Sequence, residues 1–310
     1  MKNSRNGVLK RAAVGLVVFS VGMMLGGLLL ISPTRAADDV QLTHIHGMAY
    51  SGSGEDLVMA THFGLAAHAE GGWRMLQGPA HDFMGFSGSE RAFYTSGHPG
   101  KGSPLKNPLG LMKSSDGGAT WLAMAFAGET DFHVIGAGFF SGTIYAWLPS
   151  GNSRLPEQGY YLTTDEGKTW RRMAANGLSG YPRAIAVHPA HAGTAVAASS
   201  AGVFLSTDHG ERFQNLLPGA ARAVFINLEG TEVWASIEGD PPKAVRIPLS
   251  GGAPVRMHLP DIGRAPLIYF AQNPKRRDEI AIATFTRSVY VTSGDGQRWR
   301  AIALKGKTLP

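Results

Sequence analysis

The chain has 310 residues, 44% of them hydrophobic, which is enough to build a sizeable apolar core. It contains no cysteine, which excludes disulfides and thiolate ligands and leaves histidine, carboxylate and methionine for any metal site. The formal net charge is +6, but five of the 29 basic residues and no acidic residue precede residue 37. The remainder carries 24 basic and 23 acidic residues, so we expect no nucleic-acid partner.

Residues 1–36 have the pattern of a bacterial export signal. A basic stretch that includes Lys10 and Arg11 precedes an apolar run over residues 12–31, and small residues around Ala36 offer a cleavage site. The run is also long enough to cross a bilayer as an uncleaved N-terminal membrane anchor. We therefore expect a signal peptide or an anchor over residues 1–36 and an extracytoplasmic location, periplasmic or secreted. No other membrane attachment is expected.

An eight-residue pattern, S/T-x-D-x-G-x-T-W, recurs along the rest of the chain. It is complete at residues 114–121 and 163–170, ends in phenylalanine at 206–213, and has glycine in place of aspartate at 292–299. These residue types suit a tight turn between two strands. The carboxylate caps backbone N–H groups, the glycine adopts a conformation that other residues resist, and the aromatic ring packs between neighbouring units.

The aromatic residues that end these patterns give the repeat length. Trp121 and Trp170 are 49 residues apart, Trp170 and Phe213 are 43 apart, and Phe213 and Trp299 are 86 apart. The last interval leaves room for a further unit, whose turn falls at residues 249–255. Trp73 lies 48 residues before Trp121, which makes six units. Repeats of about 40–50 residues built from short strands are typical of β-propellers.

Short apolar runs bounded by glycine, proline or serine are the expected strands, as at residues 46–50, 56–61 and 184–187. We predict a single all-β domain over residues 37–310. It is a six-bladed β-propeller of four-stranded antiparallel blades, with the repeated turn between the third and fourth strands. A seven-bladed ring is the alternative. Residues 39–42 are a candidate strand for closing the ring.

The repeated turn resembles the Asp-box, or BNR repeat, of sialidases, other glycosyl hydrolases and sortilin-type propellers, and the resemblance covers residues 73–299. The repeated turns and the histidine motifs described in the next paragraph together resemble those of exported bacterial Asp-box proteins labelled glycosyl hydrolases. The resemblance makes Asp116, Asp165 and Asp208 fold residues that face away from any site. The Arg-Ile-Pro motif of sialidases is missing from the first unit, where the first arginine is Arg74, so no sialidase residue is carried over.

Six of the 11 histidines fall at equivalent strand ends of the first three blades. The first strand of an antiparallel blade starts at the edge where the second strand ends, so we expect these six on one face of the ring, opposite the box turns. Imidazole binds Zn and Cu well, and a nearby carboxylate can be a ligand or can orient an imidazole. The predicted metal site contains His44, His46, His62, His81, His98, His133, Asp82 and Asp131. The alternative is that these are loop histidines bonded to backbone carbonyls.

The later blades carry different groups at matching positions, namely Arg183, Arg222, Arg264, Glu238 and Tyr269. Guanidinium forks match carboxylates, so the arginines are a candidate anion clamp. Glu238 and Tyr269 are candidate base and nucleophile for hydrolysis of an acidic sugar. The alternative is that the arginines are solvated loop residues.

Three functions are consistent with these patterns. The first is an exported propeller that binds Zn or Cu on its histidine-rich face, with weak catalysis or none. The second is a sialidase-like glycoside hydrolase that acts on an acidic glycan. The third is an envelope scaffold or assembly factor that binds a partner protein, because a propeller fold does not determine function. We expect a monomer in each case.

Overall fold

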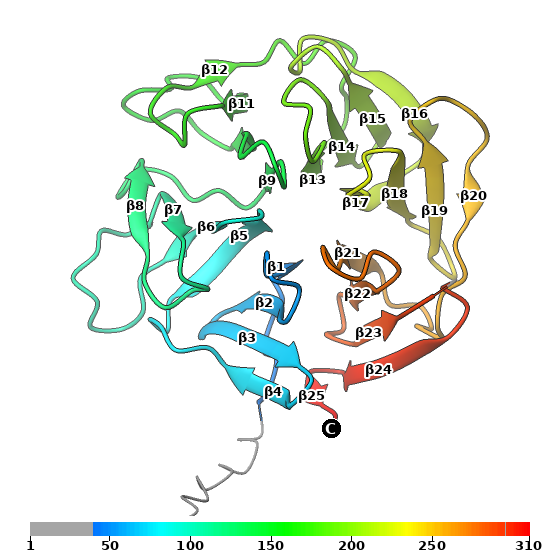
Figure 1. The fold of residues 1–310 in the computed structure, drawn as a ribbon. Helices are drawn as coiled ribbons and strands as arrows, with labels where there is room; N and C mark the ends of the chain where they lie inside the picture. Colours follow the sequence, from blue (N-terminus) through cyan, green and yellow to red (C-terminus); the bar gives the residue numbers. More distant parts are fainter. Residues whose placement is uncertain (1–39, 295) are drawn as a thin grey trace, which may run out of the picture. The chain divides into compact units, whose positions relative to one another are not determined.

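The computed structural model describes residues 40–294 and 296–310, so the predicted leader and Asp39 lie outside the described part of the chain. All regular structure in that part is β, and it contains no helix that is long and apolar enough to cross a membrane. The strands form six antiparallel sheets, arranged as blades of a ring (Figure 1). The prediction of a six-bladed all-β propeller is confirmed, and the seven-bladed alternative is wrong.

Each blade follows the chain without a crossover. Blade 1 contains β1 (Gly47–Tyr50), β2 (Leu57–Thr61), β3 (Gly64–Ala69) and β4 (Gly72–Met75), and blade 2 contains β5 (Asp82–Gly88), β6 (Phe93–His98), β7 (Leu111–Ser114) and β8 (Leu122–Ala125). Blade 3 contains β9 (Ile135–Ala137), β10 (Ile144–Leu148), β11 (Gly159–Thr163) and β12 (Arg171–Arg172), and blade 4 contains β13 (Pro182–Val187), β14 (Ala195–Ser199), β15 (Gly202–Ser206) and β16 (Gln214–Pro218). Blade 5 contains β17 (Ala221–Ile226), β18 (Glu232–Ile237), β19 (Lys243–Pro248) and β20 (Val255–Arg256), and blade 6 contains β21 (Leu267–Gln272), β22 (Ile280–Thr284), β23 (Val289–Thr292), β24 (Trp299–Leu304) and β25 (Lys307–Thr308).

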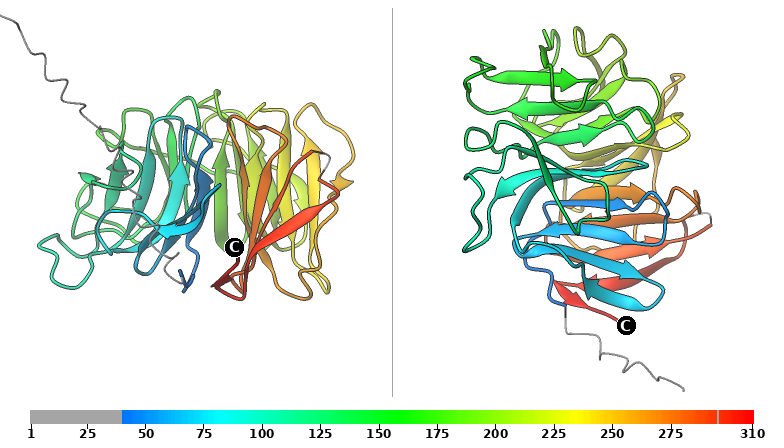
Figure 2. Two further views of the ribbon diagram at one scale, coloured as in Figure 1. Left: turned by 60° about the horizontal axis from the view of Figure 1, so that its bottom comes forward. Right: turned by 60° about the vertical axis from the view of Figure 1, so that its left-hand side comes forward.

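The first strand of every blade lies nearest the centre of the ring, and the later strands follow towards the rim (Figure 1). The strands run between the two faces of the ring, as Figure 2 shows. The second strands β2, β14 and β22 are buried along their whole length, because each blade is covered by a neighbour on both sides. This explains their continuous apolar sequences, which do not alternate as a half-exposed strand would.

The repeated turns join the third and fourth strands, as predicted. In the turn between β7 and β8, Asp116 Oδ1 accepts hydrogen bonds from Ser114 Oγ at 2.8 Å and Thr120 N at 2.9 Å. Gly118 has φ +99°, a conformation that favours glycine, and its carbonyl accepts a bond from Trp121 Nε1. Residues 163–170 form the same set of bonds around Asp165. Hydrogen bonds from the threonine of each box lower the pKa values of Asp116 and Asp165 to about 2.

The turn at residues 292–299 shows what replaces the missing aspartate. The backbone N–H of Gly294 donates to Asp278 Oδ2 at 3.0 Å, so a carboxylate from the loop before β22 reaches this turn. Thr292 Oγ1 donates to the carbonyl of Arg298. The turn thus keeps its position with a different set of hydrogen bonds.

The tryptophan that ends a repeated turn packs between its own blade and the preceding one. The ring of Trp121 lies 4.8 Å from that of Phe83, in a cluster that also contains Val58 and Leu65 of blade 1. Trp170 packs in the cluster shared by blades 2 and 3, and Trp299 in the one shared by blades 5 and 6. The repeated pattern therefore supplies the contacts that join one blade to the next.

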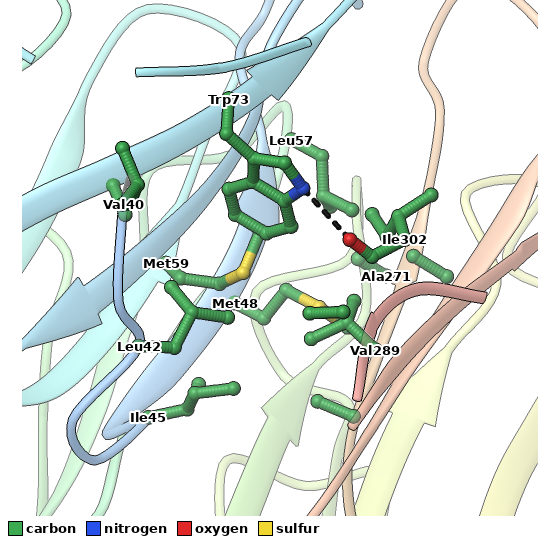
Figure 3. Packing of buried hydrophobic residues seen from close by; sticks show 14 of the residues in the cluster. Val40, Leu42, Ile45, Met48, Leu57, Met59, Trp73, Ala271, Val289 and Ile302 are labelled. Carbon is green, nitrogen blue, oxygen red and sulfur yellow. Dashed lines mark hydrogen bonds between the residues drawn. The ribbon is translucent and has the colours of Figure 1, made fainter. Parts of the chain in front are cut away.

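The ring closes without a covalent link between the first and last blades. Trp73 Nε1 of blade 1 donates to Ile302 O of blade 6 at 2.8 Å, within a shared cluster that contains the fully buried Leu42 (Figure 3). Gln41 pairs with Lys307 of β25, and Leu42 N donates to Gly306 O at 2.8 Å. The candidate closing strand at residues 39–42 is thus a single bridge at Gln41, and β25 adds a fifth strand to the last blade.

Replacing Leu42 with alanine should open a cavity at this closure. We expect Leu42→Ala to lower the free energy of unfolding by about 2–5 kcal/mol, the usual range for a buried leucine. Leu122→Ala is the matched control, because Leu122 is 64% exposed, and it should change stability by no more than about 0.5 kcal/mol. Urea unfolding measures both variants. Equal losses would show that the closure does not depend on this cluster.

The box aspartates should stabilise the fold in a pH-dependent way. Asp165→Ala removes a carboxylate whose pKa is lowered to about 2. A carboxylate whose pKa is lowered by folding stabilises the folded state when the pH is above the pKa of the unfolded state. This contribution is lost as the pH falls through the folded pKa of about 2. The melting temperature of Asp165→Ala should therefore lie below that of the wild type at pH 7, with a smaller gap at pH 2. Glu70→Ala, at an exposed turn, is the control; an equal effect of both substitutions would contradict the assignment.

Candidate functional site

The two sets of residues predicted from the sequence lie on one face of the ring. We call this the histidine face, defined as the face where the first strands begin and the second strands end. His46 directly precedes β1, His62 directly follows β2, and His98 is the last residue of β6. On the later blades, Arg183 and Arg222 are the second residues of β13 and β17, and Glu238 directly follows β18. The box turns lie on the opposite face, because the strands of a blade alternate in direction.

His44, His46 and His62 form one cluster on blade 1. One ring nitrogen of each lies within 4.8 Å of the corresponding nitrogen of the other two. The backbone explains this arrangement. His46 N donates to Ala60 O at 2.9 Å, so the segment before β1 continues alongside the end of β2. The alternation of side chains along an extended segment then places His44 and His46 on the same side.

Hydrogen bonds and burial determine the orientation and protonation of these imidazoles. His62 Nδ1 lies 2.7 Å from Asp82 Oδ1 of blade 2, and its Nε2 lies 3.1 Å from His44 Nδ1. Asp82 thereby orients His62. Burial, together with the charge of the neighbouring His62, lowers the pKa of His46 to about 4. His46 Nε2 is buried and has no hydrogen-bond partner. At neutral pH His46 is therefore neutral, the state that a metal ligand requires.

His98 and His133 meet at a different carboxylate, that of Asp131. His133 Nε2 lies 2.7 Å from Asp131 Oδ2, and His98 Nε2 lies 3.3 Å from the same oxygen. The hydrogen bond to Asp131 raises the pKa of His133. His98 Nδ1 also lies 2.7 Å from Asn107 Oδ1. These residues form a second cluster beside the blade 1 histidines.

His81 has a separate environment. It is buried, its Nδ1 accepts a hydrogen bond from Gly100 N at 2.9 Å, and its ring packs edge-on against Phe83. It therefore supports the loop that follows β6. Of the six histidines predicted to share one metal site, the structure brings three together on blade 1, pairs two through Asp131, and places His81 apart.

The arginine set is divided in a similar way. Arg183 Nη1 donates to Glu238 Oε1 at 2.5 Å, and Arg222 Nε lies 2.5 Å from the same oxygen. Burial of Glu238 opposes its ionisation, but the hydrogen bond from Arg183 and the charge of Arg222 lower its pKa overall. Arg264 pairs instead with Asp240, and its side chain is 86% exposed. Among the described residues, no hydrogen bond joins Tyr269 to Glu238, and burial raises the pKa of Tyr269. The pairing of Glu238 with Tyr269 as base and nucleophile of a hydrolase therefore stays a prediction.

A cavity of about 650 Å³ opens on the histidine face and connects the two sets. His44, His46 and His133 line it together with Arg183, Arg222 and Tyr269. The sequence analysis missed the aromatic side chains of this cavity, which belong to Trp147, Tyr181 and Phe285. Tyr181 directly precedes β13 and Phe285 directly follows β22. The strand-end positions that identified the histidines would also have identified these two.

Comparisons with known proteins support the fold. No family profile matches the sequence, and no curated protein matches it. The structure is similar to a GH74 enzyme from Niastella koreensis, with a TM-score of 0.57 and 14% identity over 86% of this chain and 46% of that one. It is also similar to YCF48 from Cyanidioschyzon merolae (TM-score 0.50, 16% identity, 88% and 90% of the two chains) and to a gluconolactonase from Xanthomonas campestris (0.58, 15%, 82% and 88%). This chain thus spans less than half of the GH74 enzyme, and these likenesses show the β-propeller fold alone.

Burial of His46 should make the metal-free protein sensitive to acid. Its folded pKa of about 4 is below the unfolded value of 6.5, so between these values the unfolded state binds a proton that the folded state excludes. Stability should fall as the pH drops from 6.5 towards 4. The slope from this group is at most about 1.4 kcal/mol per pH unit, and solvent screening reduces it. His46→Gln should flatten the profile in urea unfolding with chelator present, whereas the exposed His258→Gln should not. Superimposed wild-type and His46→Gln profiles would contradict this.

Proposed function

We propose that this protein is an exported Asp-box β-propeller that binds one Zn or Cu ion at His44, His46 and His62. The observation that carries the proposal is the cluster of three imidazoles whose ligand atoms lie within 4.8 Å of one another. One of them, His46, has a buried nitrogen without a partner. A bound cation would supply that missing partner. Neutral nitrogen ligands favour Zn and Cu over Mg and Ca, which prefer oxygen.

Asp82 supports the same proposal. Imidazoles that bind metals commonly donate their second ring N–H to a carboxylate, which fixes the tautomer and the ring orientation. The contact between His62 Nδ1 and Asp82 Oδ1 has this form. His62 Nε2, which lies 3.1 Å from His44 Nδ1 without metal, would exchange that contact for the bound ion. Three protein ligands leave a further coordination position for water or a ligand, as in catalytic zinc sites. His44 and His46 line the cavity, so that position is reached from the histidine face.

The leader and the repeated turns support the remainder of the proposal. Residues 1–36 have the pattern of an export signal or anchor, which supports a location outside the cytoplasm. The bonds around Asp116 and Asp165 are those that the Asp-box resemblance implies. The hydrolase function is less well supported, because the carboxylate of Glu238 is ion-paired with two arginines.

Metal titration tests the proposal. After treatment with chelator and dialysis, the protein should bind one Zn²⁺ or Cu²⁺ per chain in isothermal titration calorimetry at pH 7.5. His62→Ala should abolish this binding, and Asp82→Asn should weaken it by about 10- to 100-fold, as is usual for a carboxylate that orients a ligand. His258→Ala is the matched control, since His258 is exposed and distant in sequence from the cluster. Equal binding by His62→Ala and His258→Ala would rule out this site.

Bound metal should also raise the melting temperature, because an ion that binds only the folded state stabilises it. Imidazole ligands must be neutral, so protons compete with the metal as the pH falls. We expect the gap between metal-loaded and metal-free melting temperatures to be clear at pH 7.5 and to shrink towards zero near pH 5. Identical melts with and without metal at pH 7.5 would overturn the proposal.

A further inference from the structure

The cavity on the histidine face has a distinctive charge. Its lining contains the guanidinium groups of Arg183 and Arg222 and three imidazoles, but no aspartate or glutamate. Glu238 lies behind the two arginines and neutralises only one of their two positive charges. A cavity with an uncompensated cation and no carboxylate in its wall favours an anionic ligand.

Arg222 is the more exposed of the two arginines at this wall. Its Nε faces Glu238 Oε1 at 2.5 Å, but its side chain is 38% exposed, compared with 22% for Arg183. Arg183 donates to the same oxygen through Nη1. A guanidinium has five donors in a planar fork that matches a carboxylate, so the ion pair through Nε leaves the Nη groups of Arg222 for a ligand. Arg222 is thus the residue best placed to receive an incoming anion.

The rest of the cavity wall is apolar. Trp147, Ile268 and Tyr269 line it, and Tyr181 and Phe285 stand at its edge with exposed fractions of 74% and 62%. A volume of about 650 Å³ is within the range of pockets for small organic molecules, about 300–1,000 Å³. The wall therefore suits a ligand that has a ring or apolar body as well as a charged end.

From these observations we infer that the cavity binds a small organic carboxylate, with its carboxylate on Arg222 and its apolar body against Trp147 and Tyr181. This inference goes beyond the metal site and does not need it, because Arg222 and the aromatic residues belong to other blades. The nearby His44 and His46 line the same cavity. A carboxylate in place on Arg222 would therefore share the cavity with a metal ion held by those histidines.

Calorimetric titration of the chelator-treated protein tests the inference apart from the metal. Benzoate should bind, benzamide should not bind detectably because it lacks the charge, and acetate should bind more weakly because it lacks the ring. Arg222→Gln should weaken benzoate binding by about 10- to 100-fold, the usual effect of losing a hydrogen bond to a charged group. Arg264→Gln is the matched control, because Arg264 is exposed and does not line the cavity. It should bind benzoate as the wild type does.

Two further variants complete the test. Tyr181→Ala, at an exposed position, should weaken benzoate binding and leave acetate binding unchanged. Arg222→Lys keeps the ion pair with Glu238 but removes the fork, and should also lose benzoate affinity; it replaces Arg222→Gln if that variant does not fold. The inference is overturned if benzamide binds as well as benzoate, or if neither Arg222 variant differs from Arg264→Gln. It is also overturned if no carboxylate binds at about 10 mM, a concentration at which even a weak small-molecule complex forms. Zn²⁺ titration of the same samples reports the metal site separately.

Discussion

Apolar packing between neighbouring blades is the interaction on which the rest of this structure depends. A single four-stranded sheet with two apolar faces cannot bury them alone, so each blade is stable only against its neighbours. Every large buried cluster joins adjacent blades, including the one that joins blade 6 to blade 1 through Leu42 and Trp73. Alanines in the second strands, such as those of β14, keep these contacts close. The ring is the arrangement in which no blade is left uncovered.

The packing of the blades also builds the functional face. Because the first strands are innermost and run in the same sense, they all begin on one face, near the centre of the ring. Several polar and aromatic side chains near those positions line the cavity, among them His46, Tyr181 and Arg183. The box turns, on the opposite face, supply stabilising hydrogen bonds there. The stabilising turns and the proposed ligand site thus lie on opposite faces of the ring.

The two proposed ligands would occupy one cavity on the histidine face. The blade 1 imidazoles, with Asp82 orienting His62, would offer nitrogen ligands to a cation, and the arginines of blades 4 and 5 would offer positive charge to an anion. Asp131 divides the remaining histidines from the metal ligands by holding His98 and His133. A cation at one wall and an anion at the other would attract each other, so occupancy of either would favour the other.

The sequence by itself favoured six blades over seven, and it determined the place of the repeated turns and the strand ends at which His46, His62, His98, Arg183 and Arg222 lie. Those properties depend on local repeats and on strand direction, which the amino-acid pattern specifies. Tertiary structure decided that His44, His46 and His62 meet while His81 turns to the backbone of Gly100, and that Arg222 shares a cavity with His46. These findings concern the distances between residues of different blades and the directions of their side chains. They depend on how residues far apart in the chain pack between blades, which no local pattern records.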